Sequence, residues 1–288
     1  MKKLIPLLLA ILLAGCARTY DGPTETKPVL TEYTIDHYYS YFETEELHYT
    51  TRYLHAYDIY GNLVRSMEYR DGELISITKR KYDDRGNEIS QSEWNYTGLL
   101  PAFQGRTEQT YDEQNRSTSY VYYNFWGSQE GGSWYTYDDE NHIRYWKNGS
   151  GDTQTTWLDE EGRELRTVSG DSETVYHYDD RGNCIGWTGY QNGQPLDHYE
   201  ARYDDRDRQI WGGYYDTGGN LLNQTSWEYD DERNTITCHR NDGGTRVEYY
   251  HADGRPHMVE DFDAEGRRTM LQRYYYQDIL VPAKEEIP

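Results

Sequence analysis

Polar and apolar side chains alternate from about residue 32 onward, where Tyr33, Ile35, His37 and Tyr39 begin a pattern with a period of two. A period of two is typical of a β-strand that covers one face. After the first fifteen residues the chain has no sustained 3.6-residue period, which would indicate an amphipathic helix. The pattern therefore predicts an all-β protein.

A turn sequence, Tyr-Asp-x-x-Gly-(Asn or Arg), interrupts this alternation eleven times. Nine copies begin with tyrosine, ten have aspartate second and seven have glycine fifth. The copies begin at Tyr57, Tyr82, Tyr111, Tyr137, Leu158, Tyr178, Tyr203, Tyr215, Tyr229, Tyr250 and Phe262. The fifth residues other than glycine are Asn115, Asn141, Asp207 and Arg233, and Asn and Asp tolerate the left-handed backbone region.

The chemistry of this sequence is that of a hairpin turn. Aspartate at the first corner bonds to the backbone two residues on, and glycine at the fourth accepts a positive φ, as in a type I turn followed by a bulge. The predicted turn residues are Asp58, Gly61, Asp83, Gly86, Asp159, Gly162, Asp179, Gly182, Asp216, Gly219, Asp263 and Gly266.

Further turns are expected in the longer gaps between copies. These gaps contain dipeptides that favour two-residue hairpins, namely Asp71-Gly72, Asn148-Gly149, Asn192-Gly193 and Asp242-Gly243. Together the turns predict about twenty strands in an extended antiparallel hairpin sheet, which could curl. The stretch from Asn95 to Arg106, with Gly98, Pro101 and Gly105, is the expected loop insertion.

A recurrent apolar position follows each turn, seven residues after the first residue of the motif. It is occupied by Val64, Ile89, Leu165, Ile185, Ile210, Leu222 and Ile236, and by Thr118, Arg144, His257 and Thr269 in the other copies. This regularity predicts one inward-facing position in each hairpin.

The N-terminus reads as a targeting segment over residues 1–15. Lys2 and Lys3 precede an apolar stretch from Leu4 to Leu12, which is too short to span a bilayer. The following Leu13-Ala14-Gly15-Cys16 resembles the lipobox of bacterial lipoproteins. That resemblance implies cleavage between Gly15 and Cys16 and diacylglycerol on Cys16, which is the only covalent cofactor-like group expected.

The expected domain organisation follows from this N-terminus and the repeats. Residues 16–31 form the lipidated end and a polar tether, 32–276 the repeat body, and 277–288 a C-terminal tail. The expected location is extracytoplasmic, at a bacterial membrane.

Charge excludes some partners. Removal of residues 1–15 takes away two lysines and no acidic residue, so the formal net charge falls from −22 to −24. Such a field repels nucleic acid and anionic membrane surfaces, so the membrane is expected to be contacted through the lipid alone. The alternative explanation is that the negative charge serves only to keep the protein soluble. The 32 tyrosines and eight tryptophans supply the area that an ordered β body must bury.

From Tyr57 to about Arg273 the chain resembles the Rhs, or YD-repeat, family. The best matches are residues 82–87 (Tyr-Asp-Asp-Arg-Gly-Asn) and 178–183, which repeat the same six letters. The resemblance implies curled sheets or hollow shells that serve as surface, adhesion or toxin-carrying scaffolds. Large members contain an Asp-Pro self-cleavage motif, which this chain lacks, so toxin delivery is not expected.

Residues 176–187 also resemble the repeats of choline-binding and carbohydrate-binding proteins, in which Gly-Trp follows the hairpin. Gly186-Trp187 stands at the expected place, and the resemblance implies ligands held between aromatic rings of adjacent hairpins. Trp187 and Trp211 are the candidates for ligand stacking, with core packing as the alternative.

No catalytic or metal site is predicted. Carboxylate pairs such as Asp204-Asp205 are expected at turns, without the shared cleft that acid–base catalysis needs. The histidines lack paired metal spacing, and no stretch matches an EF-hand loop. Cys184 and Cys238 leave a disulfide open.

The sequence therefore predicts a lipid-anchored protein with a non-enzymatic binding or structural role, and a glycan or surface protein as partner. The alternatives are a carbohydrate- or choline-binding module and, less favoured, a glycan hydrolase.

Overall fold

The computed structural model describes residues 24–41 and 44–282, and these residues form twenty β-strands and no helix. The predicted all-β class and the expected number of strands are confirmed. The strands are β1 (Thr24–Tyr41), β2 (Thr44–Tyr57), β3 (Leu63–Arg70), β4 (Glu73–Tyr82), β5 (Glu88–Asn95), β6 (Ala102–Tyr111), β7 (Ser117–Asn124), β8 (Gln129–Asp138), β9 (Ile143–Asn148), β10 (Thr153–Leu158), β11 (Glu164–Ser169), β12 (Ser172–Tyr178), β13 (Cys184–Gln191), β14 (Gln194–Tyr203), β15 (Gln209–Asp216), β16 (Leu221–Asp230), β17 (Thr235–Arg240), β18 (Thr245–Tyr250), β19 (Pro256–Phe262) and β20 (Arg268–Pro282).

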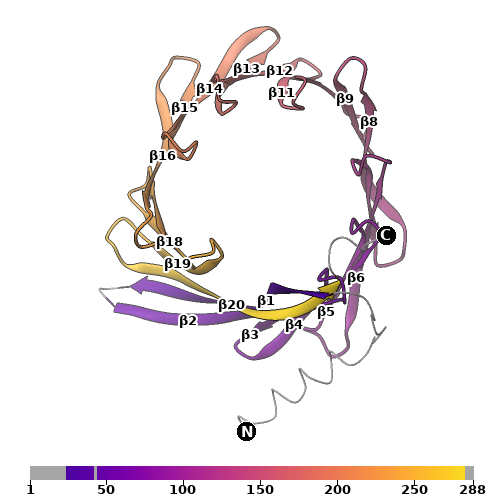
Figure 1. Ribbon diagram of the computed structural model, residues 1–288, viewed down its shortest axis with the longest axis vertical. Helices are drawn as coiled ribbons and strands as arrows, with labels where there is room; N and C mark the ends of the chain where they lie inside the picture. The colour runs from indigo at the N-terminus through magenta and orange to yellow at the C-terminus, as the bar shows by residue number, and fades with distance from the viewer. Residues whose placement is uncertain (1–23, 42–43, 283–288) are drawn as a thin grey trace.

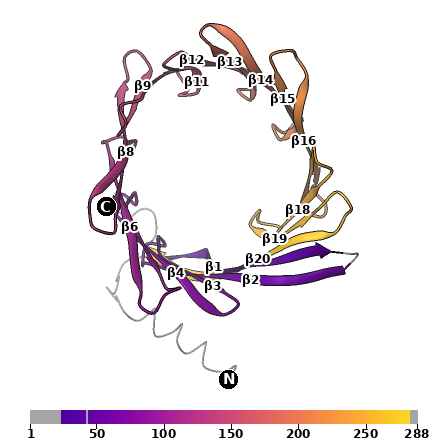
Figure 2. The same ribbon diagram turned by 180° about the vertical axis from the view of Figure 1, so that it is seen from behind.

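The strands form one closed ring. Each strand pairs antiparallel with the next, and β20 pairs with β1. Figures 1 and 2 show the ring from its two sides. The expectation of an extended sheet is wrong, because pairing between the first and last strands removes both free edges.

The β1–β20 seam includes residues outside the predicted repeat body. Its pairing runs from Thr24 opposite Pro282 to His37 opposite Met270. The predicted body of 32–276 is therefore too short at both ends. The start of β1 was not recognised in the sequence because it contains polar residues and Pro28. This proline is tolerated because, among the described strands, only β20 pairs with that part of β1.

The buried core lies at this seam. Of the seven buried hydrophobic side chains in the described ranges, six belong to β1, β2, β3, β19 and β20. Those six are Val29, Leu54, Met67, Val259, Leu271 and Val281, and the seventh is Ala201 on β14. Most side chains elsewhere in the ring are half-buried or exposed.

The Tyr-Asp turns gather at one end of the ring, here called the Tyr-Asp rim. Nine of the eleven copies follow the even-numbered strands from β2 to β18. The copies at Tyr215 and Phe262 follow β15 and β19, so they lie at the opposite rim. Consecutive strands in an antiparallel meander turn at alternate ends, which explains the long and short spacings of the repeat.

Two of the four predicted two-residue hairpins have the expected geometry. Asp71-Gly72 has φ values of 49° and 89°, and Asn192-Gly193 has 52° and 74°. The other two assignments are wrong. At Asn148 and at Arg240 the chain makes the five-residue turn of the Tyr-Asp motif, with the positive φ at Gly151 and Gly243.

In two Tyr-Asp turns the left-handed residue comes one position later than the motif suggests. The left-handed residues there are His142 and Asn234, with φ values of 54° and 53°, instead of the predicted Asn141 and Arg233. Asp138 and Asp230 still pair across the strand ends, opposite Ile143 and Thr235. The pairing therefore extends one residue closer to the turn than at Tyr82, which is the last paired residue of its strand.

The predicted insertion at Asn95–Arg106 is shorter than expected, since the segment between β5 and β6 covers only residues 96–101. Gly105 lies within β6 with a φ of 153°, and a Cβ atom there would stand 2.5 Å from the Tyr123 carbonyl oxygen. This glycine marks a close approach of two strands instead of a loop.

Candidate functional site

The aspartate of each regular Tyr-Asp turn organises its own loop. At Asp83, Oδ1 accepts hydrogen bonds from the backbone N–H groups of Arg85 and Asn87, at 3.0 and 2.8 Å. The Gly86 N–H donates to the Asp83 carbonyl oxygen at 3.1 Å, and Gly86 has a φ of 83°. Oδ1 accepts the same pair of backbone bonds at Asp58, Asp112, Asp159, Asp179, Asp204, Asp216 and Asp263.

These bonds favour the charged carboxylate. The side-chain amide of Asn87 donates to Asp83 and lowers the pKa of that carboxyl, with help from the backbone bonds. Asn183 does the same to Asp179. Asp180, which follows Asp179, is different: it is exposed and makes no hydrogen bond to any of the described residues. The turn carboxylates thus accept hydrogen bonds from the backbone of their own loops.

The repeat tyrosine links its hairpin to the preceding one. The Tyr82 hydroxyl donates to the Leu63 carbonyl oxygen at 2.9 Å, and Leu63 pairs with Tyr57 of the previous copy. Burial raises the pKa of Tyr82. The equivalent bonds, at 2.6–3.0 Å, are Tyr57 to Leu30, Tyr111 to Glu88, Tyr137 to Ser117, Tyr178 to Glu164, Tyr203 to Cys184 and Tyr229 to Gln209.

In several copies the sixth residue of the motif links its hairpin to the following one. In three copies it is an arginine whose guanidinium lies over the next repeat tyrosine on the Tyr-Asp rim, as Arg116 does over Tyr137 at 4.1 Å. In two copies it is an asparagine whose side chain bonds to the next turn, as Asn183 does to Asp207 at 2.8 Å. The sequence suggested only a local turn, whereas in several copies the motif also joins its hairpin to a neighbouring one.

The recurrent apolar position is a β-bulge. In nine of the eleven copies the pairing skips the residue seven places after the motif begins, as at Ile185, which stands between Cys184 and Gly186 without a cross-strand partner. The skipped residues are Val64, Ile89, Thr118, Leu165, Ile185, Ile210, Leu222, His257 and Thr269. The predicted inward-facing position is wrong for several copies, since Leu165, Ile185, Ile210 and Leu222 are exposed.

The two candidate stacking residues lie on opposite faces of the sheet. Trp187 pairs with Tyr199 on β14, and Trp211 pairs with Arg202 three residues farther along that strand. Because side chains alternate along a strand, positions 199 and 202 point to opposite sides. Trp187 and Trp211 therefore cannot share one ligand cage.

Each tryptophan already has neighbours within the protein. The Trp187 ring lies 6.3 Å from that of Tyr199 and 5.9 Å from that of Tyr214, which forms a row across three strands. Over Trp211 lies the Arg202 guanidinium, at 4.4 Å. These contacts provide packing for both rings, as the alternative interpretation expected.

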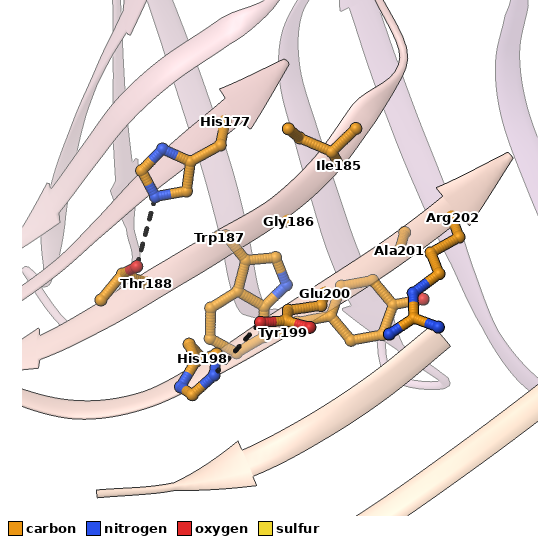
Figure 3. A pocket seen from close by; sticks show the side chains of 10 residues that line it. All are labelled: His177, Ile185, Gly186, Trp187, Thr188, His198, Tyr199, Glu200, Ala201 and Arg202. Atoms are coloured by element: carbon orange, nitrogen blue, oxygen red, sulfur yellow. Dashed lines mark hydrogen bonds and ion pairs between the residues drawn. The ribbon is translucent and has the colours of Figure 1, made fainter. Parts of the chain in front are cut away.

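A hollow of about 460 Å³ lies around Gly186, between β13 and β14. His177, Glu200 and Arg202 line it together with Ile185 and the ring pair of Trp187 and Tyr199 (Figure 3). Gly186 allows β13 and β14 to approach closely here, because a Cβ atom at residue 186 would stand 2.3 Å from the Tyr199 carbonyl oxygen. The Gly-Trp dipeptide was the sequence signal for this place.

The histidines of this hollow bond to their neighbours. His177 lies 3.2 Å from the Thr188 hydroxyl, and His198 lies 3.9 Å from Glu200 (Figure 3). The His198 ring also stacks on Tyr215 at 4.5 Å. No sequence motif indicates this polar group, because its members come from separate repeats.

A second hollow, of about 630 Å³, lies where β19 and β20 meet the turn that begins at Tyr250. His251 and His257 line it with their rings 4.8 Å apart, and the Arg255 guanidinium lies 4.8 Å from the Tyr276 ring. The spacing of these histidines along the sequence did not indicate that their rings lie together.

The remaining predicted sites concern lipidation, cysteine pairing and metal binding. Gly15 and Cys16 lie outside the described residues, and Cys184 and Cys238 are free thiols. Among the residues the structure describes, no three His, Cys, Asp or Glu side chains are placed to hold a metal ion. That part of the chain also lacks any helix with the length and apolarity needed to cross a membrane.

The fold and its turns define a closed antiparallel ring of hairpins joined by Tyr-Asp motifs. No protein-family model matches the chain, and no curated protein matches it significantly. Similar solved structures include a Tc holotoxin pore of Photorhabdus luminescens, at 14% identity and a TM-score of 0.35, over 81% of this chain and 15% of that one.

Two further structures show similarity of the same low order. TcdB2-TccC3-TEV is 12% identical, with a TM-score of 0.26 over 85% of this chain and 19% of its own. A porin-like protein from Bacteroides uniformis is 10% identical, with a TM-score of 0.37 over 86% of this chain and 98% of its own. The chain thus spans less than a fifth of the first two structures, and these values assign it to no family.

Proposed function

We propose that the protein is a bacterial lipoprotein whose hairpin ring is held outside the cytoplasm by lipid on Cys16. The support is the Leu13-Ala14-Gly15-Cys16 sequence directly after a charged and apolar leader. Only residues 17–23 separate Cys16 from β1. A chain that long spans at most about 28 Å, so the Tyr-Asp rim, where β1 begins, stands close to the membrane.

The ring itself is proposed to have a non-enzymatic binding or structural role, as a scaffold of the YD-repeat type. One observation carries this proposal: the carboxylates of the repeat are used for turn hydrogen bonds and for links between hairpins. A general acid and base would need carboxyl groups that share a cleft and differ in environment. The repeat instead gives eight of its aspartates the same pair of backbone hydrogen bonds.

A small-ligand role is the second candidate, and the hollow around Gly186 favours it. Its aromatic rings, Glu200 and Arg202 are the kinds of groups that bind sugars or other polar ligands. A thermal-shift screen with glycans and choline tests this role, since a ligand of the native state raises the unfolding midpoint. A rise that Glu200→Gln removes supports it, and unchanged midpoints leave the scaffold role favoured.

The anchor is tested by comparing the natural chain with Cys16→Ser in bacteria supplied with radiolabelled fatty acid. We expect the natural chain to carry label and to sediment with membranes, and the variant to lose both properties. Cys238→Ser is the matched control and should behave as the natural chain does. Label that persists in Cys16→Ser would contradict the proposed anchor.

A further inference from the structure

Three exposed aliphatic side chains form a periodic strip near the Tyr-Asp rim. Leu165, Ile185 and Ile210 occupy the same bulge position on β11, β13 and β15, and their exposed fractions are 41%, 39% and 37%. Alternate strands lie about 10 Å apart, so the strip extends over about 20 Å. A regular row of this kind differs from the scattered exposed apolar residues that need no explanation.

The same three turns present carboxylates beside the strip. Glu160, Asp180 and Asp205 follow the structural aspartates, are exposed, and make no hydrogen bond or ion pair within the described ranges. The arginines of these turns pair with other carboxylates: Arg163 with Asp159 at 2.6 Å, Arg181 with Asp207 at 2.9 Å, Arg206 with Asp231 at 2.6 Å and Arg208 with Asp204 at 2.7 Å.

One cation also lies close to the strip. Arg202, on the strand between Ile185 and Ile210, holds its guanidinium over Trp211. Glu200 lies beside Arg202 on β14, and the charges of these two side chains offset each other. The remaining charge near the strip is that of the three turn carboxylates. The strip is therefore an apolar row with an acidic border.

We propose that this strip docks a basic, amphipathic segment of a partner protein, with apolar side chains against the aliphatic row and cations against the carboxylates. The inference rests on the proposed binding role and names the class of partner. Charge complementarity favours a cationic occupant, since the mature chain has a net charge of −24. An anionic membrane would be repelled. A helical segment needs about 14 residues to follow the strip.

The test uses the full chain with Cys16→Ser, which keeps all described residues and needs no detergent. The probe is a fluorescent 18-residue peptide of leucine and lysine with its leucines on one helical face, and the control peptide replaces lysine with glutamate. Binding is titrated by anisotropy, at low and high salt. Fractionation tests the anchor separately, so the two proposals fail independently.

We expect the lysine peptide to bind and the glutamate peptide not to bind. Ile185→Ser combined with Ile210→Ser should weaken binding about tenfold, because two half-exposed aliphatic side chains lose their contact area. The matched control is Leu222→Ser, the same bulge position at the opposite rim. It should leave binding unchanged, and the unfolding midpoint of each variant checks its fold.

A charge variant gives a second readout. Asp180→Asn should weaken binding and reduce its salt dependence, whereas Asp171→Asn, an exposed carboxyl at the opposite rim, should do neither. The proposal is overturned by absent binding of the lysine peptide or by equal losses with Leu222→Ser. It is also overturned if the chain binds neutral phosphatidylcholine vesicles through these residues instead of the peptide.

Discussion

The repeat tyrosine acts through its hydroxyl group as well as through its ring. Seven of these hydroxyls donate to a carbonyl oxygen on the preceding hairpin. The copy at Leu158 lacks a hydroxyl, and Tyr250 donates to Glu248 instead. A single side chain therefore determines how one hairpin sits against the next.

Removal of one hydroxyl should be measurable. Tyr57→Phe leaves the Leu30 carbonyl oxygen without its 2.6 Å donor, so we expect the free energy of unfolding to fall by about 1 kcal/mol. Tyr60→Phe is the control, because the Tyr60 side chain is exposed and is not one of the repeat tyrosines that donate to the preceding hairpin. This variant should change the free energy of unfolding by no more than about 0.5 kcal/mol. Urea unfolding compares the two variants, and equal effects would contradict the hydroxyl's role.

A second residue-scale prediction concerns the close approach at Gly105. In Gly105→Ala the new methyl group meets the Tyr123 carbonyl oxygen at 2.5 Å in a backbone region that alanine avoids. We expect a loss of about 1–3 kcal/mol in unfolding free energy. Gly131→Ala has open space around it and no positive φ, so it should change stability little. A neutral Gly105→Ala would refute this explanation.

At the scale of the element, the turn is defined by its backbone geometry more than by its letters. Asn124 and Asn148 accept the same two backbone N–H bonds as the aspartates do. At Arg240 the backbone makes the turn with neither residue type. The aspartate is therefore one of several ways to hold the loop, and its particular property is that it titrates.

Acid should weaken the aspartate turns. The pKa values of Asp83, Asp179 and Asp216 are lowered by asparagine side chains and backbone N–H groups that bind the carboxylate. The unfolded chain therefore binds more protons than the folded ring at low pH. The stabilisation is present in full above the unfolded pKa of about 4 and is lost as pH falls through the lower folded values.

The experiment is urea unfolding between about pH 2.5 and pH 6 for the parent and for Asp83→Asn with Asp179→Asn. Asparagine keeps the acceptor oxygen, as Asn124 does, but cannot be protonated in this range. We expect a modest loss of stability at pH 6 and a shallower decline in acid than in the parent. An identical acid slope would show that these turns do not contribute to it.

At the scale of the whole molecule, stability depends on the seam. The buried aliphatic side chains concentrate where β1 and β20 meet, and the hairpins elsewhere are held by turn links and half-buried rings. Val281 is 3% exposed, whereas the neighbouring Leu280 is 69% exposed. The last strand therefore has one covered side and one open side.

This asymmetry gives a matched pair of variants. Val281→Asp places a charge in the buried seam, so we expect a loss of about 3 kcal/mol or more, or failure to close the ring. Leu280→Asp adds the same charge one residue away in the open and should cost no more than about 0.5 kcal/mol. Calorimetry compares them, and similar midpoints would show that the seam does not limit stability.

Features that depend on residues close together in the sequence could be predicted, and features that depend on contacts between distant strands could not. The turns could be predicted because Asp83 and Gly86 act within one loop. The bulge at Ile185, the link from Asn183 to Asp207 and the opposite faces of Trp187 and Trp211 depend on the register between strands. Spacing alone does not determine that register, because each bulge shifts it by one residue.

Closure was the least predictable feature. It depends on pairing between Thr24 and Pro282, which are at opposite ends of the described chain. Nothing local to either segment indicates the other, and Pro28 argues against a strand.

The seam also sets an order of events during synthesis. Each hairpin needs only residues already made, so turns and their links to the preceding hairpin can form as the chain emerges. β1, made first, waits for β20, made last, and until then it carries an unpaired edge. Until β20 is made, the nascent chain is therefore an open sheet whose first strand has one unpaired edge. We expect that edge to be the part of the sheet that a chaperone must protect.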